Sequence, residues 1–262
     1  MNLSFFKYQG AGNDFIVLDG RGSVPSLSAE QIAALCHRRT GIGADGLMIL
    51  LAHSDFDFEM KYYNADGREG SLCGNGGRCL TRFASDIGIN KKEFRFLASD
   101  GPHEARLAEN GWIHLHMLPV NSIDHRGADA ILHTGSPHYI RMVEDVQHFP
   151  VVEEGKRIRY NKEFSEQGIN VNFVQRVPRG LWVRTYERGV EDETLSCGTG
   201  VTAAALACAG ESREKQQTAI FTRGGELAVI FTKTGEHSFE DIWLCGPAER
   251  VFTGTIELSS NI

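Results

Sequence analysis

The sequence predicts an α+β fold with a largely antiparallel sheet, built from two related halves. Strand-like segments are short and numerous, helical segments are few, and turns rich in glycine and asparagine separate them. A Cys-Gly-x-Gly turn followed by small and apolar residues occurs twice, at Cys73–Gly76 and at Cys197–Gly200. Because the two copies fall in different halves of the chain, they indicate an internal duplication.

In the first half, Ser28 is expected to cap a helix that runs to about Arg39, with Gln31 completing the capping box. The segment Phe56–Tyr63 alternates apolar and polar side chains, as a half-buried strand does. Gly10–Asp14 is a turn by composition. The other strands expected in this half are Phe5–Tyr8, Phe15–Asp19, Leu47–Leu51, Phe94–Ala98, Glu104–Leu107 and Ile113–Met117.

In the second half, weak periodicity over Pro119–Ala130 predicts a linker between the halves. Thr134–His138 is expected to form a turn, and Pro150 to open a short helix. The strands expected in this half are Ile169–Val177, Leu181–Tyr186, Ala219–Thr222, Leu227–Thr232, Ile242–Cys245 and Val251–Leu258.

Two other patterns are set aside. Gly41–Gly46 fits the dinucleotide fingerprint G-x-G-x-x-G, but a helix is expected before it and a strand after it. Nucleotide-binding folds have the reverse order, so we exclude a nucleotide site there. His114 and His116 lie two residues apart, as side chains on one exposed face of a strand do. This spacing therefore does not indicate a metal site.

Composition narrows the class of partner and the compartment. The net charge is −7 and no basic cluster occurs, which argues against nucleic acid and anionic membranes as partners. No apolar run approaches the roughly 20 residues of a membrane-spanning helix, and the N-terminus lacks a secretory signal, so we expect a cytoplasmic protein. The six cysteines contain no C-x-x-C pair, so we expect free thiols and no zinc site.

Each Cys-Gly-x-Gly turn is expected to open a buried helix with the thiol at its N-terminal end. Unpaired N–H groups and the helix dipole favour a thiolate there and can lower the pKa of a cysteine from near 8.5 to about 7 or below. The glycines let backbone N–H groups approach an anion such as a carboxylate. The alternative for one isolated turn is a buried structural cysteine, and the duplication favours the functional interpretation.

Two such thiols on either side of one carbon acid could invert its configuration. A thiolate on one face removes a proton while a thiol on the other face supplies one. The two helix N-termini can stabilise the negative charge that develops on the neighbouring carboxylate. This chemistry requires no cofactor, and no motif in the sequence indicates a haem, a metal or pyridoxal phosphate.

The chain resembles the diaminopimelate epimerase family. The resemblance rests on GAGNDF, GIGADG, YNADG, CGNGGRC, the PH of GSPH, INVNF, YERG and ETLSCGTG, which occur in the family's order along nearly the whole chain. It implies the interconversion of LL- and meso-2,6-diaminopimelate, a step toward lysine and peptidoglycan precursors, without a cofactor. It also implies two similar domains, each a central helix wrapped by barrel-like sheet, with the active site in the cleft between them. We place the domains at residues 1–117 with 255–262, and at residues 118–254.

The resemblance assigns roles to residues of the matching motifs. Cys73 and Cys197 would be the catalytic pair, and His138 and Glu187 would tune the pKa values of their thiols. Asn13, by itself a turn residue, would contact the substrate. The full set of substrate-binding residues would be Asn13, Asn64, Gly74, Asn75, Asn170, Glu187, Arg188, Gly198 and Thr199. A homodimer is also implied.

Two positions depart from the family's pattern. Ser136 stands where Asn is common before Pro-His, and Gly46 stands where Gln often follows Gly-Ala-Asp. Both are expected near the distal, non-reacting end of the substrate. Serine keeps a donor and an acceptor but is shorter, so a water molecule could fill the gap.

Alternative functions stay open from the residues alone. One is another cofactor-independent racemase or epimerase of the same fold, acting on proline or hydroxyproline. Another is a non-catalytic ligand-binding or redox protein in which Cys73 and Cys197 pair. The adjacent Glu187 and Arg188, which end a strand just before the second thiol, favour a longer and doubly charged amino acid, because an Arg fork can clamp a carboxylate.

Overall fold

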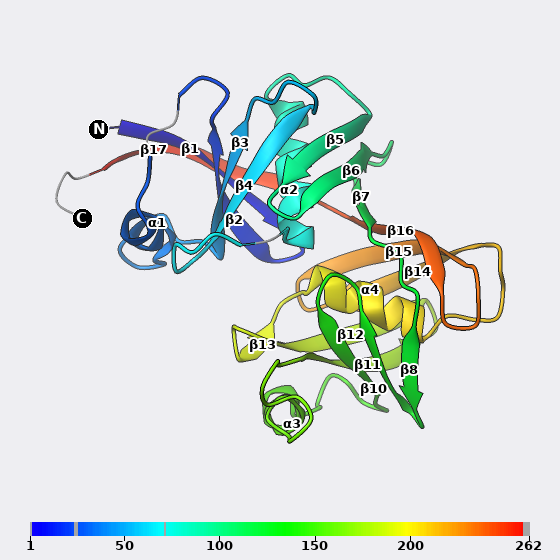
Figure 1. The fold of residues 1–262 in the computed structure, drawn as a ribbon. Coiled ribbons are helices and arrows are strands. Elements are labelled where there is room, and N and C mark those ends of the chain that lie inside the picture. Colours follow the sequence, from blue (N-terminus) through cyan, green and yellow to red (C-terminus); the bar gives the residue numbers. More distant parts are fainter. Residues whose placement is uncertain (1, 24–25, 71, 259–262) are drawn as a thin grey trace. The chain divides into compact units, whose positions relative to one another are not determined.

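The computed structural model describes residues 2–23, 26–70 and 72–258, and Figure 1 shows it as a ribbon. The chain divides into two compact units: unit 1 comprises Met1–Leu115 and Pro247–Ile262, and unit 2 comprises His116–Gly246. Short helices occur among many strands, and most strand pairs are antiparallel, which confirms the α+β class. The end of the predicted first domain, residues 259–262, lies outside the described residues.

Unit 1 is one run of paired strands around a helix. Its order is β17-β1-β2-β3-β4-β5-β6; the pairs β2/β3 and β4/β5 are parallel and the others antiparallel. Strand β7 pairs with β6, and its last two residues, His116 and Met117, belong to unit 2. The elements are β1 (Asn2–Gly10), β2 (Asn13–Asp19), α1 (Ala29–Cys36), β3 (Gly46–Leu51), β4 (Phe58–Asn64), α2 (Gly74–Asp86), β5 (Glu93–Ala98), β6 (Gly101–Leu107), β7 (Ile113–Met117) and β17 (Glu249–Glu257).

Helix α2 is the centre of unit 1. It contacts β1, β2, β3, β6 and β17. Four of its apolar side chains are completely buried: Cys79, Leu80, Phe83 and Ala84. The Phe83 ring lies 4.9 Å from that of Phe6 and 5.7 Å from that of Tyr8. Burying apolar side chains at about 25 cal/mol per Å² makes this packing the main stabilisation of the helix.

Unit 2 repeats the plan. Its order is β8-β9-β10-β11-β12-β14-β15-β16, with β10/β11 and β12/β14 parallel and the other pairs antiparallel. Helix α4 packs against β9 to β12 and β14 to β16. The elements are β8 (Ile123–Arg126), β9 (Asp129–His133), β10 (Pro137–Met142), α3 (Val151–Arg159), β11 (Asn170–Val177), β12 (Gly180–Glu187), β13 (Asp192–Thr194), α4 (Gly198–Ala207), β14 (Lys215–Thr222), β15 (Gly225–Lys233) and β16 (Phe239–Gly246).

The two strand orders correspond element by element. In each unit an antiparallel pair, a parallel pair, an antiparallel pair and a second parallel pair follow one another. This makes β2 and β3 the counterparts of β10 and β11, and α2 the counterpart of α4. The internal duplication predicted from the Cys-Gly-x-Gly repeat is therefore present in the fold.

Some local predictions were wrong. The linker predicted over Pro119–Ala130 contains β8 and the start of β9, which pair around a turn at Gly127 with φ of +66°. A strand of four residues is too short to produce a clear alternation. The turn predicted at Thr134–His138 ends earlier, because Pro137 and His138 begin β10, and β13 was not predicted. Helix α1 keeps the predicted Ser28 capping box but ends at Cys36.

Candidate active site

Each of the two duplicated cysteines is the N-cap residue of the central helix of its unit. Cys73 precedes α2 and Cys197 precedes α4, both with extended backbone, at φ −90° and φ −117°. Their carbonyl groups accept the N–H of Gly77 and of Val201. The predicted placement of both thiols at helix N-termini is therefore confirmed, and with it the proximity of each thiol to the positive end of a helix dipole.

In unit 1, Cys73 lies beside two asparagines. Its Sγ is 3.6 Å from Asn13 Oδ1, and Asn75 Nδ2 donates to the same oxygen at 3.4 Å. The Asn75 amide is itself oriented, because Arg78 donates to its Oδ1 at 3.0 Å and an arginine cannot accept. Of the predicted residues, unit 1 brings together Cys73, Gly74, Asn75 and Asn13.

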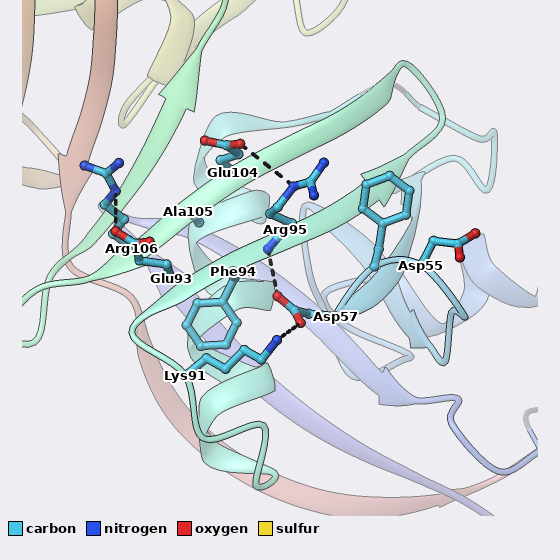
Figure 2. Close-up of a pocket in the computed structure, with 10 residues that line it drawn as sticks. Asp55, Asp57, Lys91, Glu93, Phe94, Arg95, Glu104, Ala105 and Arg106 are labelled. Carbon is cyan, nitrogen blue, oxygen red and sulfur yellow. Dashed lines mark hydrogen bonds and ion pairs between the residues drawn. The ribbon is translucent and has the colours of Figure 1, made fainter.

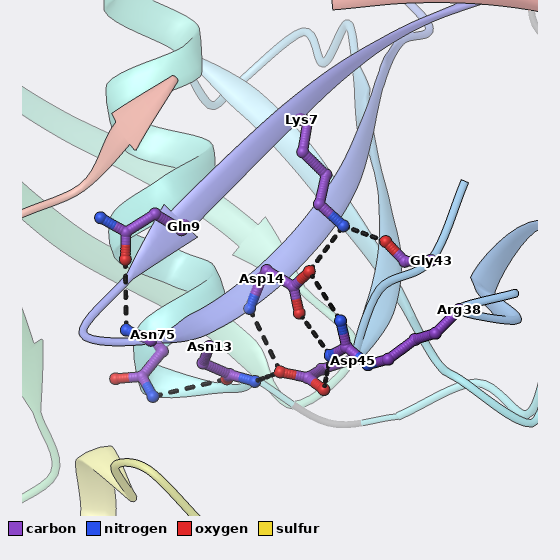
Figure 3. A network of polar contacts seen from close by, with 9 residues as sticks. Lys7, Gln9, Asn13, Asp14, Arg38, Gly43, Asp45 and Asn75 are labelled. Atoms are coloured by element: carbon purple, nitrogen blue, oxygen red, sulfur yellow. Dashed lines mark hydrogen bonds and ion pairs between the residues drawn. The ribbon is translucent and has the colours of Figure 1, made fainter. Parts of the chain in front are cut away.

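A charged network holds Asn13 in place (Figure 3). Asn13 Nδ2 donates to Asp45, which also accepts from Arg38 at 2.6 Å. Arg38 bridges to Asp14 at 2.7 Å, and Lys7 reaches the other oxygen of Asp14 at 2.6 Å. Burial works against ionisation of Asp14, but hydrogen bonds from Arg38 and Lys7 outweigh it and hold the pKa of Asp14 below its usual range. The network fixes the direction of the Asn13 amide.

Asn64 and Gly46 lie directly opposite each other on neighbouring strands β4 and β3. Asn64 Oδ1 accepts from Tyr62 Oη at 3.2 Å, and its Nδ2 donates to the Arg68 carbonyl at 3.5 Å. A Cβ at Gly46 would lie 2.6 Å from the Tyr62 ring and 2.6 Å from the Tyr63 carbonyl oxygen. The Tyr62 ring therefore takes the space that a longer side chain at position 46 would need.

In unit 2, Cys197 lies beside hydroxyl groups rather than amides. Its Sγ is 3.5 Å from Thr199 Oγ1, which lies 2.9 Å from His138 Nε2. Ser136 Oγ lies 2.9 Å from the same imidazole nitrogen and 3.2 Å from Thr199 Oγ1. Thr134 donates to the Thr199 carbonyl at 2.8 Å. Cys197, Thr199, His138 and the unusual Ser136 thus form one cluster.

His138 is completely buried. Burial, with a smaller contribution from the positive charges of His133 and Arg188, lowers the pKa of His138 to about 3. Its imidazole is therefore uncharged at neutral pH. His138 can act on a neighbouring thiol through hydrogen bonds but not as a cation.

The other predicted residues of unit 2 surround this cluster. Asn170 Nδ2 donates to Ser136 Oγ at 3.2 Å and to the Pro137 carbonyl at 3.0 Å, and its Oδ1 accepts the Arg188 N–H at 2.9 Å. The exposed Arg188 side chain donates to the Gln167 carbonyl at 3.1 Å. Glu187 ends β12 and accepts from Thr194 Oγ1 at 2.8 Å.

Other cysteines have a different character. All six lie within the described residues, and none of them is joined to another in a disulfide. Burial raises the pKa of Cys79 to about 12 and that of Cys36 to about 11, with smaller contributions from neighbouring charges. Cys208, at the C-terminal end of α4, also has a raised pKa because it is buried. These three are neutral structural thiols.

A surface pocket of about 330 Å³ lies away from these residues, over β5 and β6 (Figure 2). It is lined by charged side chains that pair with one another, such as Arg106 with Glu93 at 3.3 Å and Lys91 with Asp57. The predicted site residues are not among its described lining. Within residues 2–23, 26–70 and 72–258, no group of three or more His, Cys, Asp or Glu side chains could hold a metal ion.

Sequence reasoning missed the residues that orient the site. Asp45 and Arg38 hold Asn13, and Asn172 contacts His138. Asp45 lies inside the Gly-rich segment that we excluded as a nucleotide site, and Asn172 lies inside INVNF. A polar residue in a buried strand position was the available indication, since such groups need hydrogen-bond partners.

Sequence comparison relates this chain to diaminopimelate epimerases. The diaminopimelate epimerase family model matches residues 5–122 and 130–251. The diaminopimelate epimerase of Flavobacterium psychrophilum is 46% identical over 259 residues, covering 97% of this chain and 100% of that protein. That of Chlorobaculum tepidum is 45% identical over 259 residues, covering 95% and 99%.

Solved structures share the fold at low identity. A PhzF-family phenazine biosynthesis protein of Bacillus anthracis has a TM-score of 0.76 at 17% identity, covering 98% of this chain and 100% of that one. A hydroxyproline epimerase from Agrobacterium vitis has a TM-score of 0.68 at 15% identity, covering 99% and 94%. These two neighbours support the predicted fold and say nothing of the substrate. No described helix is long and apolar enough to cross a membrane.

Proposed function

Because the chain belongs to the diaminopimelate epimerase family, we propose that Cys73 and Cys197 invert one α-carbon of 2,6-diaminopimelate by proton transfer. The reaction is the interconversion of the LL and meso isomers, on the route to lysine and peptidoglycan precursors. The observation that carries the residue assignment is the pair of cysteines at the N-cap positions of the central helices α2 and α4.

In the proposed reaction one cysteine is a thiolate and the other a thiol. The thiolate takes the α-proton, and the electron pair left on carbon is delocalised into the adjacent carboxylate. The thiol then gives its proton to the opposite face of the carbon and becomes the thiolate. Backbone N–H groups at the Gly74-Asn75 and Gly198-Thr199 turns would stabilise the carboxylate as its charge increases.

The remaining predicted residues would hold the substrate. Asn13 and Asn75 lie next to Cys73, and Asn170 is held beside the Cys197 cluster. Asn64, Glu187 and Arg188 would contact the substrate's other polar groups, Glu187 and Arg188 being suited to an ammonium and a carboxylate. Gly46 lies opposite Asn64, and the Tyr62 ring takes the space that a longer side chain at position 46 would need. We therefore expect Tyr62, in place of that side chain, to lie near the distal end of the substrate.

A homodimer and a cytoplasmic location belong to the same proposal. Strand β17 is exposed along most of its length, including Val251 at 56% and Phe252 at 46%, and exposed apolar side chains on a strand suit pairing with a second copy. A reducing compartment would keep both reacting cysteines out of a disulfide, as the mechanism requires.

Isotope incorporation tests the mechanism. Incubation of the protein with LL-diaminopimelate in heavy water should give the meso isomer carrying deuterium at the inverted carbon, because the incoming proton comes from a thiol that exchanges with solvent. Cys73→Ala and Cys197→Ala should each lower kcat by about 10² to 10⁴-fold, the usual contribution of a positioned acid or base.

Cys208→Ala is the matched control, since Cys208 lies at the other end of α4. It should keep wild-type activity. Wild-type epimerisation in either single variant at position 73 or 197 would refute the two-cysteine assignment. A panel including proline and hydroxyproline tests the substrate class.

A further inference from the structure

The two units differ in what lies beneath their thiol turns. In unit 1 the positions on β2 and β3 that face the turn carry Phe15 and Met48. The corresponding positions of unit 2, by the paired registers of β2/β3 and β10/β11, carry His138 and Asn172. All four side chains are fully buried. An apolar pair in one unit is thus a polar pair in the other, beside Thr199 and Gly200 of the turn that follows Cys197.

The orientation of the Asn172 amide is determined by its neighbours. Its Nδ2 lies 3.1 Å from the Tyr139 carbonyl oxygen, which only accepts, so the amide nitrogen must be on that side. Its Oδ1 accepts from Thr185 Oγ1 at 2.9 Å. The same Nδ2 lies 3.1 Å from His138 Nδ1. Because an amide nitrogen only donates, Nδ1 of His138 must be the accepting nitrogen.

This fixes the tautomer of the imidazole. The pKa of His138, lowered by burial to about 3, leaves one ring hydrogen at neutral pH, and that hydrogen must be on Nε2. Nε2 lies 2.9 Å from both Thr199 Oγ1 and Ser136 Oγ, so its one hydrogen is shared between these two hydroxyl oxygens and neither hydroxyl donates to it. Ser136 also accepts from Asn170 Nδ2 at 3.2 Å.

The direction of these bonds decides where the Thr199 hydrogen points. With a donating Nε2, Thr199 Oγ1 acts as acceptor toward His138, and its own hydrogen is available to Cys197 Sγ at 3.5 Å. With the opposite tautomer, Nε2 would take a hydroxyl hydrogen. A hydroxyl that donates to sulfur stabilises a thiolate over a thiol.

We propose that Asn172 is a positioning residue that holds His138 as the Nε2–H tautomer, so that the Thr199 hydroxyl donates to the Cys197 thiolate. The proposal rests on the proposed function only in taking Cys197 as a reacting thiol. In unit 1 the corresponding positions are the apolar Phe15 and Met48, which cannot form such a series of hydrogen bonds. The two thiols are therefore not equivalent.

The tautomer is directly measurable. In histidine-labelled protein, ¹⁵N NMR should show His138 Nδ1 as the unprotonated, pyridine-type nitrogen and Nε2 as the protonated one. In Asn172→Asp the carboxylate can only accept, so the hydrogen should move to Nδ1. Thr185→Val is the matched control, because it removes a partner of Asn172 and leaves both donor contacts of the amide; its tautomer should be that of the wild type.

Cysteine reactivity and kinetics test the consequence. In Asn172→Asp, alkylation of Cys197 by iodoacetamide at neutral pH should slow about 10-fold or more, because the Cys197 thiolate loses the hydrogen bond from the Thr199 hydroxyl. The alkylation rate of Cys73 in the same protein is the internal reference. The kcat should fall by a similar factor with little change in KM, while Thr185→Val keeps both near wild type. Thr199→Val, which lacks the hydroxyl, should slow Cys197 alkylation and lower kcat as Asn172→Asp does. Thr199→Ser, which keeps the hydroxyl, should retain the alkylation rate of the wild type.

The outcomes separate this proposal from the proposed function. An Nδ1–H or cationic His138 in the wild type overturns it, as does unchanged Cys197 alkylation in a variant with the reversed tautomer. If Asn172→Asp does not fold, the proposal is tested by the Thr199→Val and Thr199→Ser variants and by the ¹⁵N spectrum of His138 in the wild type. Retention of the predicted tautomer and reactivity in a protein that lacks epimerase activity would count against the proposed function and leave this proposal standing.

Discussion

At the scale of single residues, burial turns a histidine that would titrate near neutral pH into a neutral hydrogen-bonding group. The pKa of His138 is lowered from 6.5 to about 3, mainly because charging it would place an ion in the interior. The unfolded chain binds this proton more readily than the folded one. The contribution of neutral His138 is therefore complete above pH 6.5 and is lost progressively as the pH falls toward 3.

A variant at this residue should alter the pH dependence of stability. Between pH 7 and pH 5, protonation of the unfolded chain at His138 costs the wild type about 2 kcal/mol of unfolding free energy. In His138→Gln that part of the loss should disappear, so the difference between the two pH values should shrink by about 2 kcal/mol. Urea unfolding at each pH measures it. An unchanged difference would mean that His138 is charged or accessible in the folded protein.

At the scale of elements, glycine occupies the third helical position of both α2 and α4, but only the glycine of α4 lies against an atom that cannot move away. A Cβ at Gly200 would lie 2.3 Å from Asn172 Oδ1, an atom held by the Thr185 hydroxyl. A Cβ at the equivalent Gly76 would meet Met48 Sδ at 3.1 Å. The thioether of Met48 can shift to make room. The amide of Asn172 is hydrogen-bonded at both its oxygen and its nitrogen, so it cannot shift without losing a partner.

Alanine at these two glycines should therefore have unequal effects. Gly→Ala inside a helix normally stabilises by roughly 0.5–1 kcal/mol. Gly200→Ala should instead destabilise by about 1–3 kcal/mol, the range for an overpacked core, and displace Asn172. Gly76→Ala should stay within about 1 kcal/mol of the wild type. Thermal unfolding of the pair tests this, and equal losses would show that the Asn172 contact is not the cause.

At the scale of the whole molecule, a duplicated fold places its two repeated cysteines in unlike surroundings. The units share their strand order and a central helix capped by cysteine, yet one thiol faces amide groups held by a charged network and the other faces hydroxyls. The proposed mechanism needs one ionised and one protonated thiol, and unlike surroundings favour that difference.

The exposed strand β17 yields a prediction about assembly. Val251 lies at the β-bulge between the residues paired with Lys7 and Tyr8, so replacing it leaves the strand pairing intact. Val251→Glu should raise the monomer fraction seen in analytical ultracentrifugation with little change in melting temperature. Leu118→Glu is the control, because Leu118 is another exposed apolar side chain, at 65% exposure. It should leave the monomer fraction unchanged. A wild-type sedimentation profile for Val251→Glu would place the interface elsewhere.

The sequence by itself determined the features that depend on neighbours along the chain. The Ser28 capping box, the two cysteine-capped helices and most strands follow from turn chemistry and side-chain alternation within a few residues. Resemblance to a family extended this to the fold and the reaction. Roles of individual substrate-binding residues stay predictions.

Only the tertiary structure decided which distant side chains meet. Asp45 orients Asn13 because β2 and β3 pair in parallel, and Asn172 reaches His138 because β10 and β11 do. Parallel pairing joins strands separated by a helix, so no local pattern reports it. The ionisation state of His138 likewise depends on complete burial by the surrounding chain, which is a property of packing rather than of the residue.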